Sequence, residues 1–257
     1  MISARYPPPE GPRLAGQSGG TRVRVGFVSG KFRDHAVWRA FLKGWISNMD
    51  REKFSVFGYH IASQVDGETG FARRCVTAFH QGRRSLRQWR RLITDDQLDV
   101  LVYPEVCHEP IAIKLAAMRL APVECAAAGH CVTTGLPTMD YFLSGSGVEP
   151  EYGETVYTEK LVRLPNLSYH SPPPALGSSA VAQIEGLQSG AVIFLCVQTL
   201  FKYLPQYDHL FVRIAERVGD CQFVFRDRDL SPGVGRQFRD RIEKAFRTAG
   251  LYGRRST

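Results

Sequence analysis

Residues 191–203 read AVIFLCVQTLFKY, a short apolar run followed by a polar loop. A continuous apolar run predicts a buried parallel strand, because a strand covered on both faces does not alternate with polar side chains. Gln198 and Lys202 would then leave the sheet at the carboxyl end of this strand, where open α/β sheets bind ligands. An amide and an ammonium group there suit a nucleotide base and a diphosphate. Locally, a polar loop with a solvated lysine is the alternative.

Apolar runs alternate with amphipathic segments along the rest of the chain. We expect strands at residues 23–29, 54–60, 98–102, 123–128, 140–144, 160–164, 191–195 and 221–226. We expect helices at residues 35–49, 85–94, 110–120, 205–218 and 235–250. Strands that alternate with helices predict an α/β fold with a mainly parallel sheet.

The start of the first predicted helix and the segment at residues 66–82 carry more detailed predictions. Asp34 is a plausible N-cap for the first helix, since its carboxylate can accept hydrogen bonds from free helix amides. In that helix Trp38, Phe41, Leu42 and Trp45 follow the spacing of a core-facing stripe. Residues 66–82 are predicted to be a loop with three turn-forming residues and then a short helix, interrupted at 80–82.

Composition narrows the class of protein. A net charge of +8 on 257 residues favours anionic partners such as nucleotides, nucleic acid or acidic surfaces, without choosing among them. No apolar stretch reaches the roughly 18 residues that a membrane span needs, and the N-terminus lacks the pattern of a secretory signal. The six cysteines form no CxxC pair, so they predict reduced thiols rather than a zinc site. We therefore expect a cytoplasmic protein with neither a metal nor a membrane partner.

Segments rich in proline and glycine divide the chain. Residues 1–21 predict a flexible lead-in, and residues 171–190 predict a linker. Residues 22–170 then form a first domain. Residues 191–257 hold two strands and two helices, which is only part of a nucleotide-binding α/β domain.

Several further residues could carry chemistry. His35 follows the first strand, and a neutral imidazole there could act as a base or as a hydrogen-bond donor. The loop AGHCVTTGLPTMD (128–140) contains Gly129, which permits close backbone approach, and His130 with its polar neighbours. A structural loop is the alternative for this segment.

Two other segments are weaker candidates. Residues 83–91, RRSLRQWRR, contain five arginines and could grip a nucleic-acid backbone while Trp89 stacks on a base. A solvated helix face is the alternative that we favour, so nucleic acid is not an expected partner. Cys107 beside His108 resembles a catalytic thiol, but no third group supports that interpretation.

Four segments together resemble one family. They are VRVGFVSGKFRDHAV (23–37), LAPVECAAAGHCVTTGLPTMDYFLS (120–144), YTEKLVRLP (157–165) and FLCVQTLFKYLPQYDHLFVRIAERV (194–218). In order and spacing they resemble the catalytic region of bacterial protein O-GlcNAc transferases, glycosyltransferase family 41. The resemblance implies a GT-B fold, which consists of two Rossmann-like domains. It also implies inverting, metal-independent transfer of N-acetylglucosamine from UDP-GlcNAc to serine or threonine of a protein acceptor, without a cofactor.

The resemblance also assigns roles to individual residues. His35 matches the histidine proposed as a base, and Lys202 matches the lysine that stabilises the departing diphosphate. Gln198 matches a glutamine that contacts the UDP group, and Phe201 stands where some members carry a tyrosine beside the nucleotide. The loop that faces the sugar contains Gly129 and His130.

The chain departs from the family pattern in three ways. Cys131 replaces the usual proline. No tetratricopeptide repeats precede the matched region. No match exists for the later donor-binding motif, a Gly-His-Thr-Thr-like stretch followed by an aspartate, so we expect transfer to be impaired by truncation. The alternative is a non-catalytic module that binds nucleotides or proteins.

Overall fold

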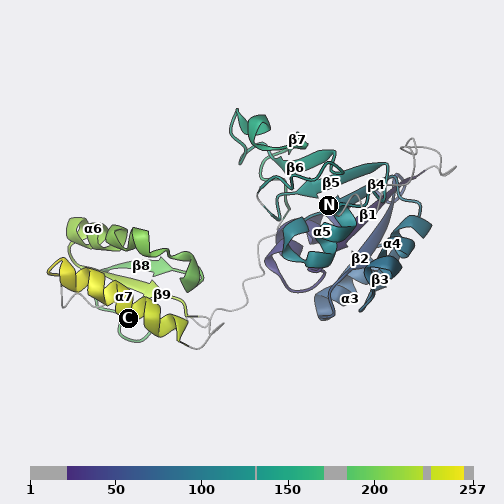
Figure 1. The fold of residues 1–257 in the computed structure, drawn as a ribbon. Coiled ribbons are helices and arrows are strands. Elements are labelled where there is room, and N and C mark those ends of the chain that lie inside the picture. The colour runs from purple at the N-terminus through teal and green to yellow at the C-terminus, as the bar shows by residue number, and fades with distance from the viewer. Residues whose placement is uncertain (1–21, 131, 171–183, 228–232, 252–257) are drawn as a thin grey trace. The chain divides into compact units, whose positions relative to one another are not determined.

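The computed structural model describes residues 22–130, 132–170, 184–227 and 233–251 (Figure 1). The chain divides into two compact units, Met1–Pro174 and Ala175–Thr257. The predicted lead-in and residues 171–183 of the predicted linker lie outside the described residues.

Unit 1 is built on a seven-stranded sheet in the order β3-β2-β1-β4-β5-β6-β7. The strands are β1 (Val23–Ser29), β2 (Phe54–His60), β3 (Ala78–Gln81), β4 (Val100–Tyr103), β5 (Val123–Ala127), β6 (Tyr141–Gly145) and β7 (Lys160–Leu164). Each neighbouring pair is parallel. All carboxyl ends therefore meet at one edge, and the predicted α/β fold is confirmed.

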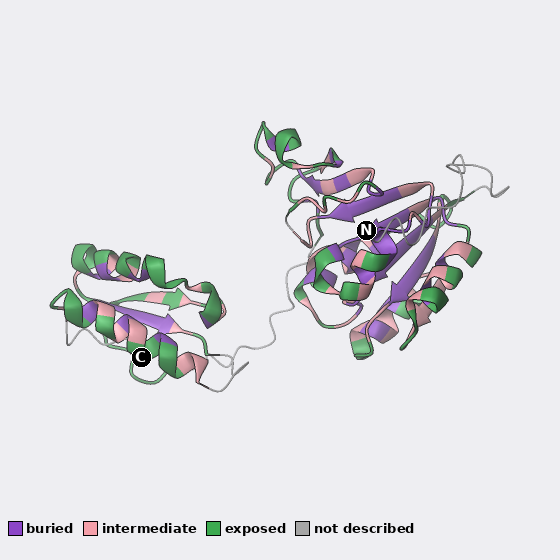
Figure 2. Cartoon of the chain, in the orientation of Figure 1, coloured by how far each residue is buried: buried purple, intermediate pink, exposed green. Residues whose placement is uncertain are grey.

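Helices pack on both faces of this sheet. They are η1 (Trp38–Leu42, a π-helical turn), α2 (Lys43–Asn48), α3 (Gly67–Arg74), α4 (Leu86–Asp95), η2 (Val106–His108), α5 (Pro110–Ala116) and η3 (Gly153–Val156). One apolar cluster joins the strands to α4 and α5 through Trp89, Ile93 and Leu115. A second cluster joins them to η1, α2 and α3, and includes Trp38. The central strands β1, β4 and β5 are mostly buried between the two layers, whereas the edge strands β3 and β7 are only partly covered (Figure 2).

Unit 2 contains two parallel strands, β8 (Val192–Cys196) and β9 (Cys221–Phe225). Its helical elements are η4 (Leu200–Lys202), η5 (Pro205–Tyr207), α6 (Asp208–Val218) and α7 (Val234–Thr248). One apolar cluster joins α6 and α7 to Phe194 of β8 and Phe223 of β9. The predicted linker residue Gln188 donates its backbone N–H to the Gln222 side chain at 2.6 Å.

The prediction that the run at 191–195 is buried was wrong, although its parallel pairing was right. Ile193 and Leu195 are 37% and 61% exposed. Successive side chains of a strand point to opposite faces, and the apolar cluster of unit 2 includes Phe194 but neither of these residues. The difference between the two strands is visible in Figure 2, where β9 is mostly buried and β8 is mostly not.

Two local predictions in unit 1 were also wrong. Asp34 does not cap the first helix: its backbone N–H donates to Asp66 at 2.7 Å, and its carboxylate pairs with Arg39. Asp66 instead caps α3, in a reciprocal box with Thr69. The segment predicted as a helix interrupted at residues 80–82 contains β3, the edge strand between α3 and α4 (Figure 1).

Candidate functional site

Three loops of unit 1 leave the carboxyl edge of the sheet beside one another. They follow β1, β4 and β5, which are neighbouring strands. The first loop carries Lys31 and His35, the second carries His108 and Glu109, and the third carries Gly129 and His130. Sequence analysis proposed residues from the first and third loops but gave the second only a weak thiol.

His35 is half-buried, and its ring is oriented by the backbone. Its Nδ1 atom accepts the N–H of Val37 at 3.1 Å. The pKa of His35 lies below its ordinary value because of burial first, and then because of the nearby charges of Lys31 and Arg33. A neutral imidazole whose Nδ1 accepts must carry its hydrogen on Nε2. Of the two roles considered for His35, this geometry favours the hydrogen-bond donor over the base.

We expect NMR of the histidine rings to show His35 as the Nε2–H tautomer at neutral pH, with a pKa below about 6.5. Replacing Lys31 by methionine should raise this pKa, because it removes a nearby positive charge. The folded chain should lose stability as the pH falls below about 6.5, since the unfolded chain then binds the proton more readily. A His35 ring in the Nδ1–H form would contradict the assignment.

His108 is the residue at this edge that sequence analysis missed as a site group. Its ring centroid lies 5.5 Å from that of His130, in an edge-to-face arrangement. Its pKa is lowered by burial first and then by the nearby Lys31 and His130. Its place just after β4 was the signal available in the sequence. Two imidazoles with lowered pKa values, those of His35 and His108, therefore lie at this edge of the sheet.

Gly129 allows the third loop to pass close to the second. A Cβ atom on this residue would lie 2.5 Å from the carbonyl oxygen of Pro104 and 3.4 Å from a methyl group of Val37. The first of these contacts is to backbone, which cannot rotate away. The predicted close approach therefore occurs against protein backbone within unit 1.

We expect Gly129→Ala to destabilise unit 1 by about 1–3 kcal/mol, as overpacking commonly does. The matched control is Gly67→Ala in α3, where a Cβ atom meets nothing within 4 Å. Alanine there should be neutral or stabilising by up to about 1 kcal/mol. Urea unfolding followed by tryptophan fluorescence measures both. Equal stabilities for the two variants would show that the loop can yield at Gly129.

The two threonines of the third loop have structural roles. The hydroxyl of Thr133 donates to Glu159 at 2.7 Å, and the backbone N–H of Thr134 donates to the same carboxylate at 2.8 Å. Glu159 is buried at the end of the loop before β7. These groups therefore hold the loop and are not free for a ligand. Cys131 lies outside the described residues.

In unit 2 the remaining proposed residues share one turn at the carboxyl end of β8. Phe201 is 63% exposed, and Lys202 is exposed and forms no ion pair with any described residue. The Gln198 side-chain oxygen accepts the N–H of Thr199 at 2.9 Å, which leaves its amide hydrogens available. The turn therefore presents an aromatic ring, a cation and an amide to solvent.

Tyr203 anchors this turn, and sequence analysis did not identify it. Its hydroxyl accepts the backbone N–H of Gln198 at 3.2 Å, and its carbonyl oxygen accepts from Arg241 at 2.6 Å. Its ring contacts Phe211, Phe225 and Phe238. The neighbouring Phe201 and Lys202 are thus held outward by a buried aromatic cluster below them.

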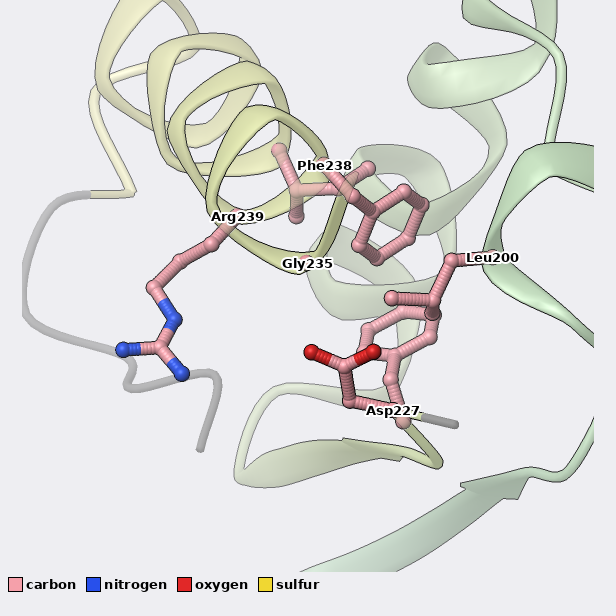
Figure 3. Close-up of a pocket in the computed structure, with 7 residues that line it drawn as sticks. Leu200, Asp227, Gly235, Phe238 and Arg239 are labelled. Carbon is pink, nitrogen blue, oxygen red and sulfur yellow. The ribbon is translucent and has the colours of Figure 1, made fainter. Parts of the chain in front are cut away.

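A pocket lies beside this turn, between the end of β9 and the start of α7 (Figure 3). Its walls are formed by seven residues: Leu200, Phe225, Asp227, Gly235, Phe238, Arg239 and Ile242. The Asp227 carboxylate points toward Gly235, at the positive end of the α7 dipole. An acidic group already occupies the place where an anion would bind, so the pocket chemistry does not suit a phosphate.

The two weaker candidates lose support in the structure. Trp89 is 0% exposed, so it is not available to stack on a nucleic-acid base, which was the less favoured interpretation of residues 83–91. Burial raises the pKa of Cys107, which keeps this residue in its unreactive thiol form. Within the described ranges, no group of three histidine, cysteine, aspartate or glutamate side chains could hold a metal ion. No described helix is both long enough and apolar enough to cross a membrane.

Comparisons with known proteins agree on one family. The model of glycosyl transferase family 41 matches residues 13–170. The chain is 27% identical over 210 residues to the probable UDP-N-acetylglucosamine–peptide N-acetylglucosaminyltransferase SPINDLY of Solanum lycopersicum, covering 79% of this chain and 22% of that protein. It is 25% identical over 235 residues to the SEC protein of Arabidopsis thaliana, which bears the same enzyme name, covering 85% and 24% respectively.

A solved structure extends the similarity over both units. A variant of the O-GlcNAc transferase of Thermobaculum terrenum superposes with a TM-score of 0.79 and 25% identity, covering 95% of this chain and 46% of that one. The chain thus spans less than a quarter of the plant relatives and less than half of this bacterial protein. On the match to residues 13–170, the chain belongs to glycosyl transferase family 41.

Proposed function

We propose that the protein takes part in the transfer of N-acetylglucosamine from UDP-GlcNAc to serine or threonine hydroxyls of protein acceptors. The observation that carries this proposal is the turn at Gln198–Lys202, in a chain that belongs to family 41. An exposed aromatic ring can stack on a nucleobase, and an exposed ammonium group can pair with a diphosphate. The names of the relatives supply the sugar and the class of acceptor.

The chemistry assigns a different task to each unit. In the reaction the acceptor oxygen bonds to the anomeric carbon, the bond from that carbon to the diphosphate breaks, and the acceptor proton passes to solvent water. Lys202 would stabilise the charge that develops on the departing UDP. The Nε2–H group of His35 would donate a hydrogen bond, and Gly129 and His130 would line the sugar side. Gln198 and Phe201 would hold the nucleotide.

The proposal also covers the division of the chain into domains, the type of transfer and the cellular location. Residues 22–170 would form the N-terminal catalytic domain, and residues 191–257 the first part of the nucleotide-binding domain. The transfer would be inverting and need neither a metal nor a cofactor. A cytoplasmic location is part of the proposal and is supported by the free thiols of Cys75, Cys107, Cys125 and Cys196.

The test combines binding with transfer. UDP is titrated into the purified chain by calorimetry, and the chain is incubated with radiolabelled UDP-GlcNAc and a peptide rich in serine and threonine. Saturable binding together with labelled peptide supports the enzyme. Binding without labelling favours the alternative of a nucleotide-binding module. No binding by a chain that circular dichroism shows to be folded would overturn the proposal.

A further inference from the structure

Glu105 is a buried carboxylic acid at the same sheet edge, just after β4. It is 2% exposed. Its Oε1 atom accepts the hydroxyl of Ser29 at 2.5 Å and the backbone N–H of Gly30 at 3.1 Å. Its other oxygen, Oε2, is buried without a hydrogen-bond partner among the described residues. Native proteins rarely leave a buried polar atom unpaired, so this carboxyl needs a physical explanation.

The contacts of Glu105 continue into the loop after β1. The Ser29 oxygen that donates to Glu105 also accepts the backbone N–H of Lys31 at 2.8 Å. The Lys31 ammonium then returns to the loop after β4, where it pairs with Glu109 at 2.9 Å. Gly30 lies directly beneath that residue, because a Cβ atom on it would be 2.7 Å from a Glu109 oxygen. The loop after β4 therefore holds the loop after β1 at two points, Ser29 and Lys31, which are the two ends of one short segment.

This joined segment leads directly to His35. After burial, the charge of Lys31 contributes most to lowering the pKa of the imidazole, and His108 from the second loop also contributes. A shift of the segment would therefore change the surroundings of His35 without any direct contact between His35 and Glu105. Glu105 is the fully buried member of this arrangement, whereas the Lys31–Glu109 pair is partly exposed.

We propose that Glu105 is a positioning residue, which fixes the loop of Lys31 and His35 from the β4 side through Ser29 and Gly30. It takes no direct part in the chemistry. The inference rests on the proposed function only in treating His35 as part of the site. Its readouts require no nucleotide, so its failure can be distinguished from a failure to bind UDP.

The protonation of Glu105 follows from its surroundings. Burial raises its pKa to about 7, against the hydrogen bonds from Ser29 and Gly30 and the charge of Lys31, which lower it. Glu109 adds a nearby negative charge that raises it further. Below neutral pH the carboxyl of Glu105 is therefore the neutral acid. Its hydrogen lies on Oε2, because Oε1 accepts the hydrogen bonds from Ser29 and Gly30. A glutamine side chain has the same shape as the neutral acid and carries no charge. Glu105→Gln should therefore preserve the contacts that the neutral acid makes.

The experiment uses the full chain and NMR of the histidine rings and of the Gly30 and Lys31 amides. Glu105→Ala should move the pKa of His35 upward toward about 6.5, and it should shift both amide signals. Glu105→Gln should keep all three close to wild type. Ser29→Ala, a smaller change, should reproduce the direction of the alanine variant if Glu105→Ala does not fold.

A second buried acid provides the control. Glu124 is 0% exposed, its pKa is raised by burial to about 8, and it lies near the start of β5, at the opposite edge of the sheet. Glu124→Gln should leave the signals of His35, Gly30 and Lys31 unchanged. Two outcomes would overturn the proposal. The first is that the signals stay unchanged in both Glu105→Ala and Ser29→Ala. The second is that Glu124→Gln shifts these signals as much as Glu105→Ala does.

Discussion

Replacing Lys202 by alanine should weaken the binding of UDP by roughly 10- to 100-fold, the effect of losing a charged hydrogen bond worth about 1.5–3 kcal/mol. Lys202 is exposed, lies in the turn of η4 and has no acidic partner among the described residues. Its ammonium group is therefore available to a diphosphate without breaking an existing ion pair. Calorimetric titration of UDP into the wild-type and variant chains measures the difference.

Lys244→Ala is the matched control for this prediction. Lys244 is exposed on α7 of the same unit, and its replacement removes the same charge. UDP binding should change less than about twofold in that variant, because exposed charges beyond a Debye length of about 8 Å are largely screened. Equal weakening in both variants would mean that the general positive charge of the chain attracts UDP. Unchanged affinity in Lys202→Ala would remove Lys202 from the site.

The strands could be predicted from sequence because their signal is local. The bounds of β1, β2 and β7 were predicted without error, since each has apolar side chains at most of its positions and lies between turn signals. β3 was missed because its four residues, AFHQ, include two polar side chains and no valine or isoleucine. It forms because β2 offers a free edge, and this depends on tertiary structure.

Burial could not be predicted with the same success. The run at 191–195 has the composition of a fully covered strand, yet Leu195 is exposed because it lies on the face of β8 that the apolar cluster of unit 2 does not include. Composition records what a strand could bury, whereas the number of covering layers depends on the rest of the fold. Trp89 shows the reverse case, since a tryptophan among five arginines is completely buried.

Sequence analysis proposed candidate site residues only where a residue follows a strand with a clear motif. His35 and Lys202 were proposed in that way. His108, Glu105 and Tyr203 were not, because their importance comes from register and packing. β4 lies beside β1 only because the chain crosses over after β3, which brings Glu105 to Ser29 across 76 positions of sequence. No local pattern encodes such a contact.

Replacing Trp89 by alanine should destabilise unit 1 by about 3–5 kcal/mol, the usual cost of removing a fully buried aromatic side chain. Trp89 lies on the inner face of α4, in the cluster that joins this helix to the sheet. All three tryptophans of the chain, Trp38, Trp45 and Trp89, belong to unit 1. The two that remain report the unfolding of this unit in urea by fluorescence, independently of unit 2.

Two further variants separate packing from the polar group of the indole. The Trp89 Nε1 atom is buried without a hydrogen-bond partner among the described residues. Trp89→Phe removes this unpaired donor, a relief of about 1–3 kcal/mol that offsets part of the lost packing, so it should cost much less than alanine. Arg87→Ala, on the exposed side of α4, should change stability by no more than about 0.5 kcal/mol. If Trp89→Ala cost no more than Arg87→Ala, the indole would not belong to the core, and base stacking by residues 83–91 would again be open to test.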